Sequence, residues 1–297
     1  MKMVTSMATK IKNATSACIR KFRTAFNIPV VYRYKEFSIL VPASHLLPEY
    51  QKRHPKYDRF LPHLAKFIAP SDTIIDIGAN VGDTLAGMAE HNSTSRYVCI
   101  EPDDSFYEHL QKNIERIKNS KTDLRVHTIK SLVGKGISGV SLDGKGGTKH
   151  AVVDNSGSIK SKTLDELLSR TDYSNIRMLK TDVDGFDYDV LDSSAAVIRE
   201  YKPILFCEVQ YDFEYQMNGY EKTLRALESE GYCDWTIFDN FGEIVLRTKS
   251  LAIVVQLMRY VWNQNTGRTT RTIYYYDVLA VQESDSNLID RVLSDYD

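Results

Sequence analysis

Short apolar runs alternate with amphipathic stretches from Thr73 onward, and this alternation limits the possible folds more than any other feature. The apolar runs predict strands at 73–77, 96–101, 124–129, 178–182 and 204–209. The amphipathic stretches predict helices at 83–91, 105–118, 164–170, 188–199 and 220–230. Such alternation builds right-handed βαβ units around a parallel sheet. With two antiparallel closing strands at 235–239 and 273–282, we expect a doubly wound, mostly parallel seven-stranded α/β sheet.

The segment that precedes this alternation is strongly basic. Eight Lys and Arg residues and no acid come before Glu36, and apolar residues recur at helical spacing from Val4 to Phe22. Three interpretations stay open: an amphipathic helix on an anionic membrane face, a transit-type leader, and a helix packed on the domain or on a partner subunit. We divide the chain into a helical amino-terminal extension at 1–36, a strand-and-helix cover at 37–70 and the main α/β domain at 71–297.

Composition excludes several classes of protein. A net charge of -1 argues against nucleic-acid binding as the main role. The four cysteines lie far apart without a CxxC pair, which is typical of a reducing compartment. No run of 18 apolar residues is present, so we expect no segment to cross a membrane. We therefore expect a cytoplasmic protein, with peripheral membrane contact through residues 1–35 as an alternative; the sequence does not indicate an oligomeric state.

A glycine-containing loop joins the first strand of the domain to its first helix, in the run Asp76-Ile-Gly-Ala-Asn-Val-Gly-Asp-Thr84. Ligands bind at such strand ends in open α/β sheets, and glycine lets them approach the backbone. A dinucleotide site needs G-x-G-x-x-G, but here the three glycine places hold Gly78, Asn80 and Asp83. Asp76 and Asp83 would repel a pyrophosphate, whereas they suit the ammonium and sulfonium groups of S-adenosylmethionine (SAM). The charge pattern favours SAM over NAD.

A second acid ends the next strand. Glu101, which lies 25 residues after Asp76, is placed to accept hydrogen bonds from both hydroxyls of a ribose. Asp103 or Ser105 is expected to cap the helix that follows. The residues that we expect to bind the cofactor are Asp76, Gly78, Asn80, Gly82, Asp83, Thr84, Glu101, Pro102, Asp103 and Ser131.

These motifs resemble the FkbM family of SAM-dependent methyltransferases. The loop at 76–84 and Glu101-Pro-Asp103 carry the resemblance, and segments 162–168, 180–187, 203–208 and 276–279 are similar to further family landmarks in the same order. The resemblance covers about residues 60–282. It implies a class I, Rossmann-like SAM-methyltransferase fold and O-methylation, typically of hydroxyls on natural products or sugars. Asp184 and Asp187 depart from the family, whose members more often have Glu at both places.

The fourth strand ends in a cluster of acids that we interpret as the chemical centre. Side chains alternate along a strand, so Lys180 and Asp182 share a face, with Asp182 at the tip. An acid at the tip of an apolar strand is costly unless it has a role, and Glu208 stands at the next such tip. We interpret Asp187 as a helix cap or dipole partner. The expected catalytic residues are Asp182, Glu208, Lys180 and Asp184.

Two roles for the acids stay open. A clustered carboxylate has a raised pKa and could remove the proton of a substrate hydroxyl. Alternatively, Asp182 and Glu208 could hold Mg²⁺, which would orient and acidify that hydroxyl. Two loops are expected nearby: a hairpin or mobile loop in the glycine-rich segment 134–157, and a loop after Glu208 whose aromatic side chains form an acceptor wall. Those side chains are Tyr211, Phe213 and Tyr215.

The sequence as a whole predicts a SAM-dependent O-methyltransferase whose small-molecule or glycan acceptor is a saccharide or a glycosylated natural product. One alternative is an NAD-linked sugar-modifying enzyme, which Asn80 and Asp83 disfavour. Another is a non-catalytic SAM-fold subunit that binds a membrane or a partner through its basic amino terminus. The intact acids at both cofactor strands disfavour this last interpretation.

Overall fold

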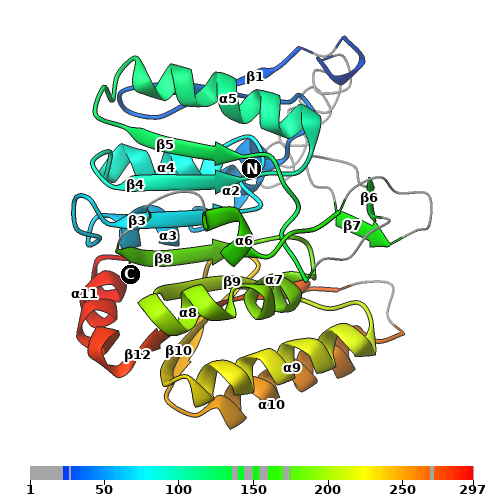
Figure 1. The fold of residues 1–297 in the computed structure, drawn as a ribbon. Coiled ribbons are helices and arrows are strands. Elements are labelled where there is room, and N and C mark those ends of the chain that lie inside the picture. Colours follow the sequence, from blue (N-terminus) through cyan, green and yellow to red (C-terminus); the bar gives the residue numbers. More distant parts are fainter. Residues whose placement is uncertain are drawn as a thin grey trace, which may run out of the picture.

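An eight-stranded sheet forms the centre of the molecule (Figure 1). The computed structural model describes residues 23–26, 28–135, 140–143, 150–153, 160–169, 173, 175–267 and 271–296, so the helix expected before residue 23 lies outside it. In spatial order the strands are β11 (Ile244–Thr248), β10 (Tyr232–Asp239), β12 (Tyr275–Gln282), β9 (Ile204–Gln210), β8 (Ile176–Thr181), β3 (Thr73–Ile77), β4 (Arg96–Ile100) and β5 (Arg125–Ile129). Strands β9, β8, β3, β4 and β5 are parallel to one another. The three remaining pairs, β9 with β12, β12 with β10 and β10 with β11, are antiparallel.

The doubly wound, mostly parallel class is confirmed, but the sheet has one strand more than the seven expected. The additional strand, β11, turns back from β10 through a short loop closed by the Asp239 N–H, which donates to the Glu243 carbonyl at 2.9 Å. Its residues are only partly buried at the edge of the sheet, which leaves a weak apolar signal. The two expected closing strands, β10 and β12, are antiparallel as predicted.

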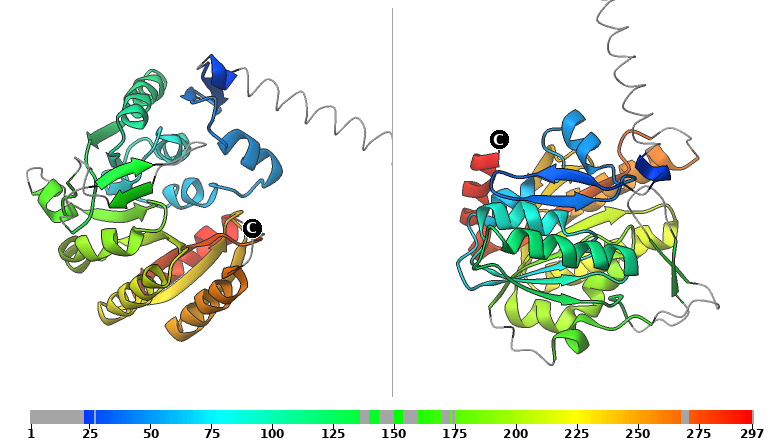
Figure 2. Two further views of the ribbon diagram at one scale, coloured as in Figure 1. Left: turned by 90° about the vertical axis from the view of Figure 1, so that its right-hand side faces the viewer. Right: turned by 90° about the horizontal axis from the view of Figure 1, so that it is seen from above.

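Helices cover both faces of the sheet, and each face has its own hydrophobic core (Figure 2). One core contains side chains of α3 (Phe60–Ala65), α4 (Asp83–His91), α5 (Asp104–Lys118) and α11 (Ser286–Tyr296). The other contains side chains of α6 (Leu164–Leu168), α7 (Asp187–Ser193), α8 (Ala195–Tyr201), α9 (Glu214–Ser229) and α10 (Leu251–Asn265). None of the helices in the described ranges is both long and apolar enough to span a membrane.

The single helix expected at 188–199 is wrong, because α7 and α8 are separate helices that meet at Ser194. The hydroxyls of Ser193 and Ser194 both donate to the Val190 carbonyl at 2.8 Å. Serine side chains compete in this way with the backbone for helical carbonyls and favour an interruption.

The segment before the main domain, here called the cover, packs with its hairpin on α5. Strands β1 (Val30–Arg33) and β2 (Ser38–Val41) pair antiparallel, so their hairpin spans the division expected after residue 36. Asn113 of α5 joins this hairpin to the domain, since it bonds both backbone groups of Leu40 at 2.8 and 2.9 Å. The short helix α2 (Leu47–Arg53) and the link to α3 complete the cover.

The glycine-rich segment 134–157 contains the expected hairpin. Strands β6 (Val140–Asp143) and β7 (His150–Val153) pair antiparallel and form a two-stranded sheet apart from the main one. The rest of that segment after Lys135 lies outside the described residues.

Candidate functional site

A cavity of about 1460 Å³ lies where the parallel strands end. Its walls come from the loops after β3, β4, β8 and β9, from the link between α2 and α3, and from the start of β12. Part of the wall is apolar: Phe60 lies 5.7 Å from Phe206 and 4.4 Å from Phe238 between ring centroids. A single small ligand usually occupies a pocket of about 300–1,000 Å³. The cavity is therefore large enough for two ligands to meet in it.

The loop after β3 has an unusual backbone that its sequence explains. Gly78, Asn80 and Gly82 have φ angles of 75°, 47° and 82°, all in the left-handed region, where Asn is tolerated better than other side chains. A Cβ on Gly78 would lie 2.0 Å from the backbone oxygen of Asp182. Gly78 is thus required because β3 and β8 approach each other closely at their ends. The sequence interpretation assigned that close approach to a ligand, and here the neighbouring backbone makes it.

Glu101 is held at the cavity wall by two backbone donors. Its Oε2 accepts from the Asn80 N–H at 2.9 Å and its Oε1 accepts from the Asp103 N–H at 2.8 Å. Burial, which leaves the residue 5% exposed, raises the pKa of Glu101 to about 7. Asp103 is the expected cap of α5, since its carboxylate accepts from the N–H groups of Ser105 and Phe106 at 3.0 Å.

A buried ion pair lies beneath the loop. Lys180 Nζ is 2.9 Å from Asp76 Oδ1 and donates to the Gly78 carbonyl at 3.1 Å, while Asp182 Oδ2 is 3.5 Å away. Burial lowers the pKa of Lys180, but the carboxylates of Asp76 and Asp182 outweigh this and hold the pKa above its ordinary value. The charge of Asp76 is therefore compensated inside the protein, and Asp76 does not line the cavity as the sequence interpretation expected.

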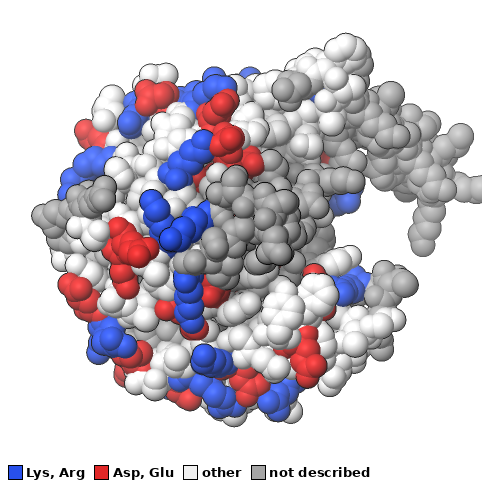
Figure 3. Space-filling view, turned by 45° about the vertical axis from the view of Figure 1, so that its right-hand side comes forward, with Lys and Arg blue, Asp and Glu red and all other residues white. Residues whose placement is uncertain are grey.

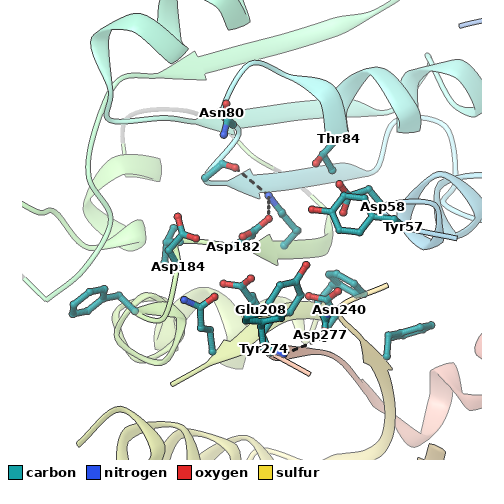
Figure 4. A pocket seen from close by; sticks show the side chains of 18 of the residues that line it. Tyr57, Asp58, Asn80, Thr84, Asp182, Asp184, Glu208, Asn240, Tyr274 and Asp277 are labelled. Atoms are coloured by element: carbon teal, nitrogen blue, oxygen red, sulfur yellow. Dashed lines mark hydrogen bonds and ion pairs between the residues drawn. The ribbon is translucent and has the colours of Figure 1, made fainter. Parts of the chain in front are cut away.

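Nine acidic residues line the cavity. Five of them lie close to the ends of β8, β9 and β12 and to the link before α3: Asp58, Asp182, Asp184, Glu208 and Asp277 (Figure 4). The side chain of Asp182 is 51% exposed, whereas Glu208 is only 6% exposed and its Oε2 has no hydrogen-bond partner. Burial, together with the charges of Asp182 and Asp184, raises the pKa of Glu208 well above its ordinary range. Burial and the charge of Asp182 do the same for Asp277.

Asp187 has a structural environment, in line with its sequence interpretation. It begins α7, is fully buried, and accepts hydrogen bonds from the Thr181 hydroxyl at 2.8 Å and the Tyr220 hydroxyl at 3.3 Å. Burial raises its pKa to about 7, and the Asp182 carboxylate adds to the effect.

The structure brings most of the expected site residues together and leaves four apart. The expected residues that line the cavity are Gly78, Asn80, Asp83, Thr84, Glu101, Pro102, Lys180, Asp182, Asp184 and Glu208. Those that do not are Asp76, Gly82, Asp103 and Ser131. The Ser131 hydroxyl donates to the Leu132 carbonyl at 3.3 Å. Its neighbour Leu132 lines the cavity, whereas Ser131 does not.

The aromatic wall expected after β9 is partly wrong. Tyr211 is buried in the core and donates to the Met258 carbonyl at 2.6 Å. Phe213 and Tyr215 do line the cavity, with ring centroids 5.6 Å apart, but they lie at the start of α9 instead of in a loop. Helix α9 begins six residues before the expected start at 220, and the Gln216 side chain accepts there from the backbone N–H groups of Asp212 and Phe213.

Several residues that line the cavity were not assigned to the site from the sequence: Tyr57, Asp58, Asn240, Tyr275 and Asp277. The strand period offers a signal for two of them, because Tyr275 and Asp277 share the face opposite to the buried Tyr276. Tyr57 and Asp58 come from the cover, and their position depends on how it folds over the sheet.

Other candidates for a base or a metal site are less well placed. Three histidines precede the first strand of the main domain: His45 lines the cavity, His54 stacks on Phe241 with ring centroids 3.9 Å apart, and His63 pairs with Asp295 at 3.0 Å. In the part of the chain that the structure describes, no group of three or more His, Cys, Asp or Glu side chains is arranged to hold a metal ion.

The sequence and the structure were compared with known protein families and with solved structures. A family model described as the methyltransferase FkbM domain matches residues 76–233. The chain is similar to a methyltransferase FkbM from Methylobacillus flagellatus KT, with 13% identity, a TM-score of 0.39 and coverage of 79% of this chain and 58% of that chain. It is also similar to an O-methyltransferase from Bacillus cereus in complex with S-adenosylhomocysteine (SAH). That comparison has 13% identity, a TM-score of 0.45 and coverage of 90% of this chain and 97% of that chain. The comparison with human methyltransferase 10 domain containing protein has 12% identity, a TM-score of 0.46 and coverage of 90% of this chain and 96% of that chain. No curated protein matches the sequence.

Proposed function

The chain belongs to the FkbM methyltransferase family, and from this premise we propose that it transfers the methyl group of SAM to a hydroxyl of a saccharide or of a glycosylated natural product. The observation that supports the proposal is that most of the expected cofactor residues and the expected catalytic acids line the same cavity. The loop after β3 and Glu101 form one part of its wall, and Asp182 and Glu208 form another. A donor and an acceptor held at these two parts would meet inside a single site.

The residues at the donor part fit SAM. Each oxygen of Glu101 uses one lone pair on a backbone N–H and keeps acceptor capacity toward the cavity. Two adjacent hydroxyls, such as those of a ribose, are the matching donors. Asn80, Asp83 and Thr84 would line the rest of the donor site. When bound, SAM would supply a methyl group on a positively charged sulfur, which is a good leaving group.

Asp182 is the proposed general base. Its half-exposed carboxylate reaches the cavity, where it would accept the proton of the acceptor hydroxyl. Lys180 lies 3.5 Å away and orients this carboxylate from beneath. Since a cationic side chain already neutralises part of the charge here, we favour a base over a Mg²⁺ site. Positioning of the two substrates would supply most of the remaining rate acceleration.

Replacing Glu101 with Ala is expected to weaken SAM binding by about 10- to 150-fold. Hydrogen bonds to a charged acceptor contribute about 1.5–3 kcal/mol, and about 1.4 kcal/mol corresponds to tenfold in affinity. Calorimetric titration with SAM measures the change. Asp104→Ala is the matched control, because that acid pairs with Lys130 on the surface and does not line the cavity. Tight binding of NAD without binding of SAM would refute the proposed function.

Residues 1–22 offer a separate test of the membrane interpretation. If they form an interfacial helix, the full chain should sediment with vesicles that contain anionic lipid and should be released as salt rises, since exposed charge attractions are screened. A chain that lacks residues 1–22 should stay in the supernatant and bind SAM as before. Equal sedimentation of the two chains would exclude the interpretation.

A further inference from the structure

Two acids face each other across neighbouring strands at the acceptor part of the cavity. Glu208 of β9 and Asp277 of β12 are register partners in an antiparallel pair, and both line the cavity. Side chains at such positions have Cβ atoms about 4.5–5.5 Å apart, and like charges placed there destabilise the sheet. An arrangement of this kind is costly unless a ligand compensates it.

No ion pair in the described ranges compensates these two acids, although the charge of Lys180 partly offsets the effect of burial on the pKa of Asp277. Neither Glu208 nor Asp277 forms an ion pair within the described ranges, and Oε2 of the nine-tenths-buried Glu208 has no hydrogen-bond partner. Lys180, the buried cation of the cavity, is engaged by Asp76 and the Gly78 carbonyl. The remaining charges near the pair are acidic as well: Asp58, Asp182, Asp184 and Asp187.

The described part of the face in Figure 3 shows no comparable excess of acid, because basic and acidic side chains are interspersed over it. Inside the cavity, Glu208 and Asp277 point into the same space as Asp182 (Figure 4). An unpartnered buried carboxylate is a strong acceptor whose natural complement is a charged donor.

We propose that Glu208 and Asp277 bind an ammonium group of the acceptor, so that the substrate is an amino sugar or an amine-bearing glycoside. This inference names the substrate class for the proposed function and rests on it. The pair is separated from the donor motifs of β3 and β4 by the intervening strand β8. It therefore belongs to the acceptor part of the cavity.

The chemistry of an ammonium group suits this position. It carries three donors and no acceptor, so one ammonium can bond both carboxylates at once. Phe60, Phe206 and Phe238 offer an apolar surface beside the pair for the carbon skeleton of the acceptor. A bound ammonium has no lone pair with which to accept a methyl group. The methyl group consequently goes to a hydroxyl of the same molecule, whose proton passes to Asp182.

The test compares sugars that differ only in the group on one carbon, which is an ammonium, a hydroxyl or an acetamide. The full chain is saturated with SAH and titrated calorimetrically with glucosamine, glucose and N-acetylglucosamine. We expect glucosamine to bind at least about tenfold more tightly than either neutral sugar, in keeping with hydrogen bonds between charged partners. Glucosamine that binds no more tightly than glucose, including the case in which neither binds, would overturn the proposal. That result would mean that the two acids merely share a proton.

Charge-removing variants test whether the preference for glucosamine depends on Glu208 and Asp277. Glu208→Gln and Asp277→Asn keep the shape of each side chain and remove its charge, so each should abolish the preference for glucosamine while SAH affinity stays the same. Asp212→Asn is the matched control, since this cavity acid is already paired with Arg271, and it should keep the preference. A preference that survives in both Glu208→Gln and Asp277→Asn would refute the assignment to this pair.

The same titrations separate the two proposals. If SAH binds but no ammonium preference is found, the amine inference fails and the proposed function stands. If SAH and SAM do not bind, the proposed function fails, and the sugar titrations repeated without SAH still decide whether the pair binds an ammonium.

Discussion

Replacing Lys180 with Met should lower the free energy of unfolding by about 3–5 kcal/mol, the usual effect of removing one partner from a buried ion pair. Lys180 is 3% exposed and Asp76 is 0% exposed, so water cannot replace the lost partner. The lysine also donates to the Gly78 carbonyl and thereby ties the loop after β3 to the end of β8. Urea unfolding followed by circular dichroism measures the loss.

A surface lysine and a double variant serve as controls for this result. Lys249→Met removes an ion pair with Glu283 in which both side chains are more than half exposed, and such solvent-screened pairs contribute little to stability. Combining Asp76→Asn with Lys180→Met leaves no uncompensated buried charge, so the double variant should be more stable than Lys180→Met alone. Equal losses for Lys180→Met and Lys249→Met would show that burial of the pair has no consequence.

Replacing Asp182 with Asn should reduce methyl transfer by about 10²–10⁴-fold, the usual contribution of a positioned general base. The side chain is half exposed and lies outside the core, so folding and SAM affinity should be retained. Release of SAH from SAM, measured with the best acceptor from a panel of amino sugars, reports the rate. Glu208→Gln should reduce turnover as well, through weaker binding of the acceptor.

Chelation distinguishes the two chemical roles considered for Asp182. A general base predicts that a chelator leaves wild-type turnover unchanged. A Mg²⁺ site predicts that the chelator abolishes turnover and that added Mg²⁺ restores it. Normal turnover of Asp182→Asn would place the base elsewhere, and His45 would be the next candidate, since it is the one of the three histidines before β3 that lines the cavity.

The proposed donor part of the site could be predicted from the sequence because it depends on local order. A strand, a tight loop and a helix follow one another directly at 73–91, and the same order recurs at Glu101. Parallel strands bring their carboxyl ends to one edge of the sheet, so the tips that carry Glu101, Asp182 and Glu208 had to meet once the βαβ pattern was recognised. Even the left-handed backbone at Asn80 agrees with its residue type.

Where an acid points was decided only by tertiary structure. Asp76 and Asp182 both stand near strand ends, yet Asp76 is enclosed with Lys180 while Asp182 is half exposed. The reason is that Asp76 lies within β3, whose residues are all buried, whereas Asp182 follows the last residue of β8. The partner of Glu208 lies 69 residues away in Asp277, on a strand that enters the sheet antiparallel after α10. Neither apolar period nor a local motif specifies that register.

Local pattern therefore determined the parallel part of the sheet, the loop after β3 and the acids at the strand tips, since each depends on neighbours within one βαβ unit. Tertiary packing decided the acceptor part: the cover set Tyr57 and Asp58 over the cavity, and the pairing of β9 with β12 brought Glu208 and Asp277 together. These contacts join segments that are distant in sequence, and their geometry exists only when the cover and the last strands have packed on the sheet.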